Sequence, residues 1–429
     1  MKLVSSSKFL SEDLEQVKAR GMLKTSSVIE NVRRIVESVR KEGDKALLRY
    51  TLKFDGVDLT DKGLEVPERE ILDAYDKLRE EEVKAIKFAA ESIRRFHKAQ
   101  IPKEIVFSPF KGVELRQKFL PLESIGVYTP GGIASYPSTV LMCAIPARVA
   151  GVDKIFLCSP PSRRGEVSPY ILVAAHIAGV DKIFRVGGAQ AIAALAYGTQ
   201  SIPKVDKIVG PGNVFVNAAK LEVSWDVAID LPAGPSEIAV IADGSADPEL
   251  VACDLVAQAE HDVNTFALLL TDSERLATEV QRRIEHILTK VDRRGVAKKA
   301  LEKNGYIVTV KDLEEAVHIV NLVAPEHVQV LTENPQLTAE KIRNAGAIFV
   351  GGFSPVALGD YSSGLNHVLP TGGYAKVYSP LSVRDFLKAV NILKCDKEGF
   401  ELLSGTAIEL ARMEGLEAHA YSLESRRRF

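Results

Sequence analysis

Apolar residues recur at helical spacing through the first hundred residues of the chain. Ser27 and Glu30 are spaced as a capping box, and a regular apolar face follows them. The apolar positions of that face are Val28, Val32, Ile35, Val36 and Val39. A second long helix is predicted from Pro67 to about Gln100, where an Ile-Pro step ends it. This part of the chain is therefore predicted to be mostly helical.

The pattern changes in the middle third, where Val-Asp-Lys-Ile occurs three times, at residues 152–155, 180–183 and 205–208. The first two copies follow a glycine that ends an apolar helix, Gly151 and Gly179, and both lead into a short strand pattern. Helices and strands that alternate in this way are typical of βα units. We therefore predict a parallel sheet with right-handed crossovers.

A second block of alternating strands and helices begins near residue 238. The predicted strands are 238–241, 266–270, 307–310, 328–331 and 347–350, and the predicted helices include 248–260 and 272–288. After Pro380 the pattern predicts helix to the end of the chain, broken at Gly415.

These patterns predict an α/β fold with two Rossmann-like parallel-sheet domains. A helical arm at residues 1–22 precedes them, and a helical tail at residues 381–429 follows. The larger domain is predicted to combine residues 23–127 with 237–380, and the second Rossmann-like domain to cover 128–236.

Composition narrows the class of protein. A net charge of −2 gives no basic field for nucleic acid, and 46% hydrophobic with 26% charged residues is ordinary for a soluble globular protein. No apolar stretch is long enough for a membrane span, and the first residues lack the apolar core of a signal peptide. Four scattered cysteines fit neither a disulfide framework nor a thiolate zinc cluster, which favours a cytoplasmic protein.

Two acid/base residues, Glu326 and His327, stand side by side after Pro325 in an otherwise apolar stretch. A carboxylate and an imidazole in contact can divide proton-transfer work between two steps of a reaction. The alternative is a pair that only satisfies backbone groups at the rim of a strand. Adjacent residues on a regular strand face opposite ways, so we expect the pair at the point where the strand begins.

Three strands run into glycine-containing turns, at residues 125–132, 186–190 and 209–213. Strand, glycine turn and helix is the arrangement in which backbone amides meet the phosphates of a ligand. None of the turns matches the dinucleotide-binding fingerprint, and each alone is explained by ordinary turn chemistry. Three of them in one parallel sheet favour a nucleotide site.

Several polar residues could bind a metal or a substrate. Gln258 and His261 are spaced to lie on one face of a helix, and Asp360 lies in a long glycine- and serine-rich loop. With His419 of the tail they form a set of nitrogen and oxygen ligands that suits zinc or a similar divalent ion. His367 is either a substrate contact or a loop-stabilising hydrogen-bonding group.

Six motifs taken together resemble the histidinol dehydrogenase family, from about residue 20 to the end of the chain. The motifs are Gly126-Val-Tyr-Thr-Pro-Gly-Gly132, Gly210-Pro-Gly-Asn213, Ala233-Gly-Pro-Ser-Glu237, Gln258-Ala-Glu-His261, Ala324-Pro-Glu-His327 and Ser363-Gly-Leu-Asn-His-Val-Leu-Pro-Thr-Gly-Gly373. The resemblance implies the last step of histidine biosynthesis. In that step L-histidinol is oxidised twice by NAD, through L-histidinal, to L-histidine.

The resemblance also implies a homodimer that exchanges its C-terminal tails and holds one zinc ion per site. By that similarity the zinc ligands are Gln258, His261 and Asp360 of one subunit and His419 of the other. The resemblance implies that these four residues and His327 also contact the substrate. The further substrate contacts implied are Ser236, His367 and Glu414, and the NAD contacts are Tyr128, Gln190 and Asn213.

The residue types fit this chemistry. His327 is the natural base for the alcohol proton in the first oxidation, and Glu326 is the natural base for the water that hydrates the aldehyde. Two other classes of function use part of the same pattern. A zinc-dependent hydrolase would use the metal ligands and leave the glycine turns without a role, and a two-domain binding protein would leave the acid/base pair without one.

Overall fold

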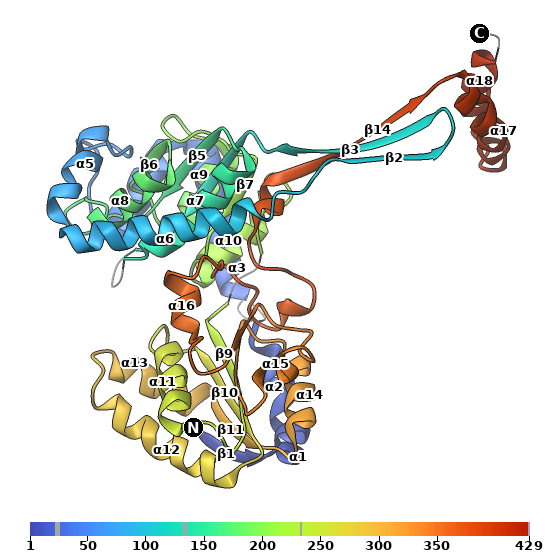
Figure 1. Cartoon of the computed structure of the whole chain (residues 1–429). Helices are drawn as coiled ribbons and strands as arrows, with labels where there is room; N and C mark the ends of the chain where they lie inside the picture. Colours follow the sequence, from blue (N-terminus) through green and yellow to red (C-terminus); the bar gives the residue numbers. More distant parts are fainter. Residues whose placement is uncertain (22–25, 132–134, 232–233, 428–429) are drawn as a thin grey trace.

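The computed structural model describes residues 1–21, 26–131, 135–231 and 234–427. These residues form two lobes, each built on a parallel sheet, and an arm that projects away from them and ends in the C-terminal helices (Figure 1). The predicted α/β class is confirmed. Within the described ranges no helix combines the length and apolar character needed to cross a membrane.

The first lobe contains a six-stranded parallel sheet in the order β1-β11-β10-β9-β12-β13. Its strands are β1 (Lys2–Ser5), β9 (Glu237–Ala242), β10 (Phe266–Thr271), β11 (Gly305–Thr309), β12 (His327–Leu331) and β13 (Ala347–Val350). β9 and β10 are buried along their whole length because helices cover both faces of the sheet. All five strands predicted for this block are present, and the predicted N-terminal helical arm begins with the edge strand β1.

Helices pack on both faces of this sheet. Those that share one apolar core are α11 (Pro248–Ala259), α12 (Glu274–Leu288) and α13 (Arg294–Asn304). The opposite core is formed by α14 (Leu313–Val323) with the N-terminal segments α1 (Ser6–Lys8), η1 (Phe9–Asp13), α2 (Leu14–Lys18) and η2 (Ala19–Gly21). The short helices α15 (Pro335–Ala339) and α16 (Val356–Tyr361) follow β12 and β13.

The second lobe contains a five-stranded parallel sheet in the order β6-β5-β4-β7-β8. Its strands are β4 (Ser124–Tyr128), β5 (Lys154–Cys158), β6 (Lys182–Phe184), β7 (Lys207–Val209) and β8 (Ala228–Ile229). Each Val-Asp-Lys-Ile copy leads into one of the strands β5, β6 and β7, as predicted. Gly151 and Gly179 end their helices at φ +95° and +80°, a conformation that a residue with a Cβ seldom adopts.

Eight helices of the described chain cover this second sheet. They are α3 (Ser26–Glu42), α4 (Asp44–Asp55), α5 (Glu68–Asp73), α6 (Glu80–Lys98), α7 (Pro137–Ala150), α8 (Pro169–Ala178), α9 (Gly188–Tyr197) and α10 (Val214–Val223). The predicted boundaries group residues 23–127 with 237–380, whereas the helices from 26 to 98 pack on the five-stranded sheet. The predicted helix after Pro67 is also divided, because Leu78 is extended and α6 starts after Arg79, whose backbone N–H donates to Oε2 of Glu82 at 2.8 Å.

The arm is a three-stranded antiparallel sheet followed by two helices. Its strands are β2 (Ile105–Phe110), β3 (Val113–Pro121) and β14 (Leu387–Cys395), and its helices are α17 (Lys397–Met413) and α18 (Glu417–Arg426). The prediction of helix from Pro380 onward was wrong for residues 387–395, because β14 pairs with β3 along its whole length. The predicted break at Gly415, with φ +73°, is present. Two 3₁₀ helices, η4 (Tyr374–Lys376) and η5 (Val383–Phe386), precede β14.

Candidate active site

Glu326 and His327 lie where β12 begins, as predicted for an acid/base pair. α14 ends at Val323, and Ala324 takes φ +49°, which makes it the one described residue other than glycine with a positive φ. Pro325 then directs the chain into the strand. Both side chains are buried, with 7% of Glu326 and 3% of His327 exposed, so their polar atoms need partners within the protein.

The backbone of Glu237, the first residue of β9, contacts both members of the pair. Its N–H donates to Oε2 of Glu326 at 2.8 Å, and its carbonyl oxygen lies 3.0 Å from Nδ1 of His327. A carbonyl oxygen can only accept, so Nδ1 carries the proton and, in the neutral ring, Nε2 has a lone pair available. Nε2 has no hydrogen-bond partner among the described residues and lies 3.7 Å from Oδ1 of Asp360.

The charges of the pair depend on each other. Burial raises the pKa of Glu326, because the carboxylate loses its hydration, although the neighbouring His327 opposes the shift. Burial lowers the pKa of His327, but the carboxyl groups of Glu326 and Asp360 outweigh this effect and raise it overall. Nδ1 of His327 lies 3.5 Å from Oε2 of Glu326, so the two groups form one coupled unit.

Two predicted metal or substrate residues, Asp360 and His261, lie close enough to His327 for their charges to interact, and a third, Gln258, lies near His261 in the chain. Asp360 lies in α16, and although burial opposes its ionisation, His327 and the neighbouring imidazoles lower its pKa. Gln258 is buried in the last turn of α11. His261 lies just beyond that helix, which ends at Ala259, so it is not on the helix as predicted, but a bond from its N–H to the carbonyl of Gln258 continues the turn.

The chemistry of these side chains suits a metal ligand set. Burial lowers the pKa of His261, which favours the neutral imidazole that binds metals, and the charge of Asp360 acts on it directly. Within the described part of this single chain, no three residues of the His, Cys, Asp and Glu types are grouped to hold a metal ion.

His367 connects the two lobes next to the pair. Its Nδ1 donates to the backbone oxygen of Asp360 at 3.0 Å, and its Nε2 lies 3.3 Å from Oγ1 of Thr139 in α7. Burial lowers the pKa of His367, so its ring is favoured in the neutral form. Ser236 directly precedes Glu237, at the amino end of β9. Ser236 and His367 thus lie on segments that meet the pair.

Glu414 and His419, in contrast, lie far from these residues. Glu414 caps the C-terminal end of α17 and His419 lies in α18, at the tip of the arm (Figure 1). Both are exposed. A single chain therefore does not bring them to the segments that carry Glu326 and His327.

The three glycine turns lie together at the carboxyl edge of the five-stranded sheet, after β4, β6 and β7. Burial raises the pKa of Tyr128 to about 12, and its hydroxyl accepts a bond from the N–H of Gly188, where α9 begins. Asn213 caps α10 by accepting from the N–H groups of Phe215 and Val216. Residues 132–134 of the first turn lie outside the described residues.

Several buried polar atoms at this edge lack a hydrogen-bond partner in the described chain. They are Oγ1 of Thr129, Oγ of Ser159 and Oε1 of Gln190. Gly210, at φ +117°, allows the turn after β7 to approach β4, because a Cβ there would lie 2.1 Å from the carbonyl oxygen of Tyr128. Unpartnered polar atoms and close backbone approach are what a dinucleotide site at this edge requires.

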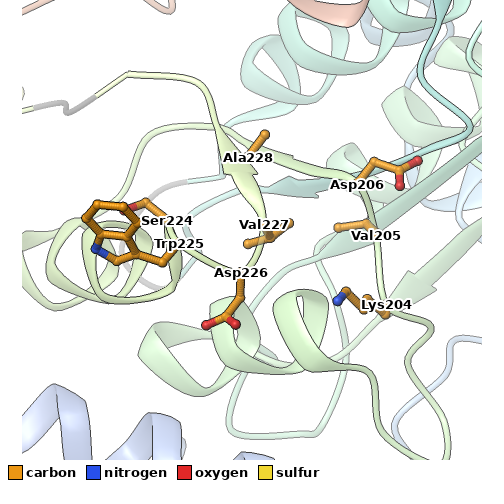
Figure 2. Close-up of a pocket in the computed structure, with 8 residues that line it drawn as sticks. All are labelled: Lys204, Val205, Asp206, Ser224, Trp225, Asp226, Val227 and Ala228. Atoms are coloured by element: carbon orange, nitrogen blue, oxygen red, sulfur yellow. The ribbon is translucent and has the colours of Figure 1, made fainter. Parts of the chain in front are cut away.

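A surface pocket lies at the opposite edge of the same sheet. Figure 2 shows it between the segments that precede β7 and β8, beside the exposed Trp225. It contains none of the predicted site residues. The residues around His327, in contrast, combine buried titratable groups with an unpartnered atom, Nε2 of His327.

Sequence reasoning missed Glu237, whose backbone bonds to both members of the pair, and Arg20, which pairs with the Glu237 carboxylate. Glu237 is part of the Ala233-Gly-Pro-Ser-Glu237 motif, so a buried carboxylate beside Ser236 was a usable signal. Nothing in the sequence around Arg20 distinguishes it from the other basic residues of the N-terminal helices.

Comparison with known proteins gives one consistent result. The family model described as histidinol dehydrogenase matches residues 18–427. The histidinol dehydrogenase of Methanosarcina barkeri is 47% identical over 96% of both chains, and that of Aquifex aeolicus is 47% identical over 97% of both. The crystal structure of histidinol dehydrogenase from Elizabethkingia anophelis has a TM-score of 0.93 at 39% identity and covers 97% of this chain and 96% of its own.

The match extends over both lobes and the arm, at an identity far above what a shared fold alone would give. The chain is therefore an oxidoreductase that belongs to the histidinol dehydrogenase family.

Proposed function

We propose that this protein oxidises L-histidinol to L-histidine in two NAD-dependent steps, through L-histidinal, with a zinc ion orienting the substrate. The observation that carries the proposal is the buried Glu326–His327 pair, in which Nε2 of His327 is available as a proton acceptor. Two successive oxidations of one carbon need two proton transfers of different kinds, and the pair offers two different bases.

In the first oxidation the alcohol loses a proton and a hydride. Nε2 of His327 takes the hydroxyl proton, because Nδ1 is already engaged with the carbonyl of Glu237. The aldehyde is then hydrated: Glu326, whose pKa is raised by burial, takes a proton from the attacking water, and the protonated His327 returns its proton to the aldehyde oxygen, which leaves Nε2 free to act as a base again. The hydrated aldehyde loses the second hydride while His327 again accepts the hydroxyl proton, which leaves the carboxylic acid.

Zinc fits the donor set of Gln258, His261 and Asp360, completed by His419 of a second copy, because these are nitrogen and oxygen ligands of the kind zinc accepts. When bound, zinc would hold the imidazole and amine of histidinol and so fix the position of the alcohol carbon. Ser236 and His367, which lie on segments that meet the pair, and Glu414 of the second copy would supply the remaining contacts to the substrate.

NAD fits the carboxyl edge of the five-stranded sheet, where glycine turns and the starts of α9 and α10 coincide. When bound, NAD accepts the hydride in each oxidation. Tyr128 and Gln190 would contact it there, the second through the unpartnered Oε1. Asn213, which caps α10, would hold the helix start in the orientation that the cofactor meets.

The exposed apolar surface of the arm supports a homodimer. A three-stranded sheet with both faces exposed is poorly stable alone. The exposed apolar residues of β2, β3 and β14 are Ile105, Val106, Phe107, Phe110, Leu115, Leu120, Val390 and Leu393. A second apolar patch beside Asp360 consists of Phe353, Leu358 and Tyr361, and Phe353 is 99% exposed. Two copies that exchange their arms would cover both surfaces and bring His419 and Glu414 to the partner's site.

One assay tests the proposal. The protein is incubated with zinc, L-histidinol and NAD, and the absorbance of reduced nicotinamide is followed together with the products. We expect two reduced nicotinamides for each histidinol consumed and L-histidine as the product. Absence of reduced nicotinamide from zinc-loaded protein would contradict the proposal, and a stoichiometry of one with accumulated aldehyde would contradict the second step.

A further inference from the structure

Arg20 and Glu237 form a buried ion pair between segments that are distant in the sequence. Nε and Nη2 of Arg20 lie 2.6 Å and 2.8 Å from the two carboxylate oxygens of Glu237, in the parallel two-bond geometry that makes such pairs strong. Only 13% of the arginine side chain and 3% of the glutamate side chain are exposed. The N-terminal arm is thereby joined to the start of β9.

Each oxygen of the Glu237 carboxylate accepts a further bond. Oε1 accepts from the N–H of Gly372 at 2.8 Å, and Oε2 accepts from the N–H of Glu326 at 3.3 Å. Nη2 of Arg20 also donates to the carbonyl of Val323 at 3.0 Å. The ion pair therefore ties together the loop at residue 372, the end of α14 and the start of β12.

These bonds surround the segment that carries both candidate bases. Val323 is the residue before Ala324, whose positive φ turns the chain toward Pro325. A non-glycine residue in that conformation is strained by about 1–3 kcal/mol and persists only where its surroundings fix it. Arg20 holds the chain before this turn, and the carboxylate of Glu237 holds the N–H of Glu326 after it.

We propose that the Arg20–Glu237 pair is a positioning device that fixes Glu326 and His327 in their reactive geometry. The inference rests on the proposed function. A buried ion pair contributes little net stability compared with apolar residues of similar size. A role in positioning the neighbouring segments therefore explains this pair better than a role in stability. Because the backbone of Glu237 bonds both to Oε2 of Glu326 and to Nδ1 of His327, movement of this one residue displaces both bases together.

The test compares Glu237→Gln and Arg20→Lys with the wild-type enzyme. Glu237→Gln keeps the size of the side chain but loses its charge, and Arg20→Lys keeps the charge but loses the two-bond fork. We expect kcat to fall on the order of 10²-fold in Glu237→Gln with histidinol and with histidinal alike, while KM changes less than about threefold. Arg20→Lys should show a smaller loss in the same direction, and zinc content should stay at the wild-type level in both.

Glu70→Gln is the matched control, because Glu70 pairs with the buried Arg185 at 2.9 Å in the other lobe. It should lower the melting temperature without changing kcat. An unchanged kcat in Glu237→Gln would overturn the positioning role, and so would losses that follow zinc content or KM. If Glu237→Gln does not fold, a wild-type kcat in Arg20→Lys would overturn the positioning role in its place. A wild-type enzyme that forms no reduced nicotinamide would instead contradict the proposed function.

Discussion

Five strands of the six-stranded sheet are ordered like the five strands of the other sheet, but the candidate functional groups of the two sheets lie at opposite ends of the strands. β11-β10-β9-β12-β13 repeats the order β6-β5-β4-β7-β8, and β1 adds one strand at the edge. In the five-stranded sheet the glycine turns follow the carboxyl ends of the strands. In the six-stranded sheet Glu237 and His327 are the first residues of their strands.

The difference follows from the backbone groups that each edge offers. The amino ends of parallel strands present unpaired N–H groups, which suit carboxylates such as those of Glu326 and Glu237. The carboxyl ends lead into helix N-termini, which suit the phosphates of a dinucleotide. Under the proposed function, one topology would therefore supply a proton-transfer edge in one lobe and a cofactor edge in the other.

The largest expected effect comes from His327→Ala at the proton-transfer edge. Without a base at this position both oxidations should slow by about 10²–10⁴-fold, because the alcohol proton is transferred in each. Steady-state rates with histidinol and with histidinal measure the two losses separately. If the rate falls with only one of the two substrates, His327 does not serve both oxidations, and the coupled pair is not used in each step.

Glu326→Gln should separate the two steps. We expect the rate with supplied histidinal to fall by about 10²-fold or more, because hydration of the aldehyde loses its base, while the release of the first reduced nicotinamide from histidinol changes much less. A rapid-mixing experiment measures that first release directly. Equal losses with both substrates would contradict the division of roles between Glu326 and His327.

Mixed dimers test whether the proton-transfer edge is completed by a second copy. Asp360→Ala and His419→Ala homodimers should each be inactive, since each lacks one ligand in both sites. If His419 crosses between subunits, the heterodimer contains one intact site. A random mixture of the two variants should then recover roughly a quarter of wild-type activity, as the symmetry of a two-fold dimer requires. No recovery after subunit exchange would assign His419 to its own chain or to no site.

The sequence predicts most strands of both sheets because their patterns are local, but it does not predict the edge strands β1 and β8. Val-Asp-Lys-Ile marks the start of three strands, and buried strands such as β9 and β10 appear as short apolar runs between helices. It does not predict β14, which is mostly exposed and owes its conformation to pairing with β3, more than 260 residues earlier in the chain. Long-range pairing of this kind leaves little trace in local periodicity.

The candidate site shows the same limit. Glu326 and His327 were visible as polar residues in an apolar stretch, and their place at the strand start follows from the alternation of side chains along a strand. Arg20 was not visible, because its partner Glu237 lies 217 positions away and its role exists only in three dimensions. Whether Gln258, His261 and Asp360 bind zinc stays a prediction, since the ligand expected to complete the set lies on the arm.

Gly210→Ala should weaken the cofactor edge without affecting the proton-transfer edge. The new Cβ would lie 2.1 Å from the carbonyl oxygen of Tyr128, and φ +117° is strained for alanine, so β4 and the turn must separate. We expect KM for NAD to rise by about tenfold and stability to fall by about 1–3 kcal/mol, while KM for histidinol changes little. Gly295→Ala, where a Cβ meets no neighbour, is the control. A rise in KM for histidinol equal to that for NAD would show that the two edges are not separate.

The smallest effect concerns a carboxyl group that serves neither edge. Burial raises the pKa of Asp254 in α11 to about 6 from an ordinary value of 3.8. The folded protein then binds this proton more tightly than the unfolded chain, so stability falls as the pH rises from about 4 to about 6 and the penalty is complete above that range. A pKa change from 3.8 to about 6 corresponds to about 3 kcal/mol. Because the side chain is only partly buried, Asp254→Asn should stabilise the protein by somewhat less, up to about 2 kcal/mol at pH 8, and by almost nothing near pH 4. Melting curves of both proteins at the two pH values measure the difference. An equal gain in stability at both pH values would show that burial of the ionised carboxylate does not destabilise the folded protein.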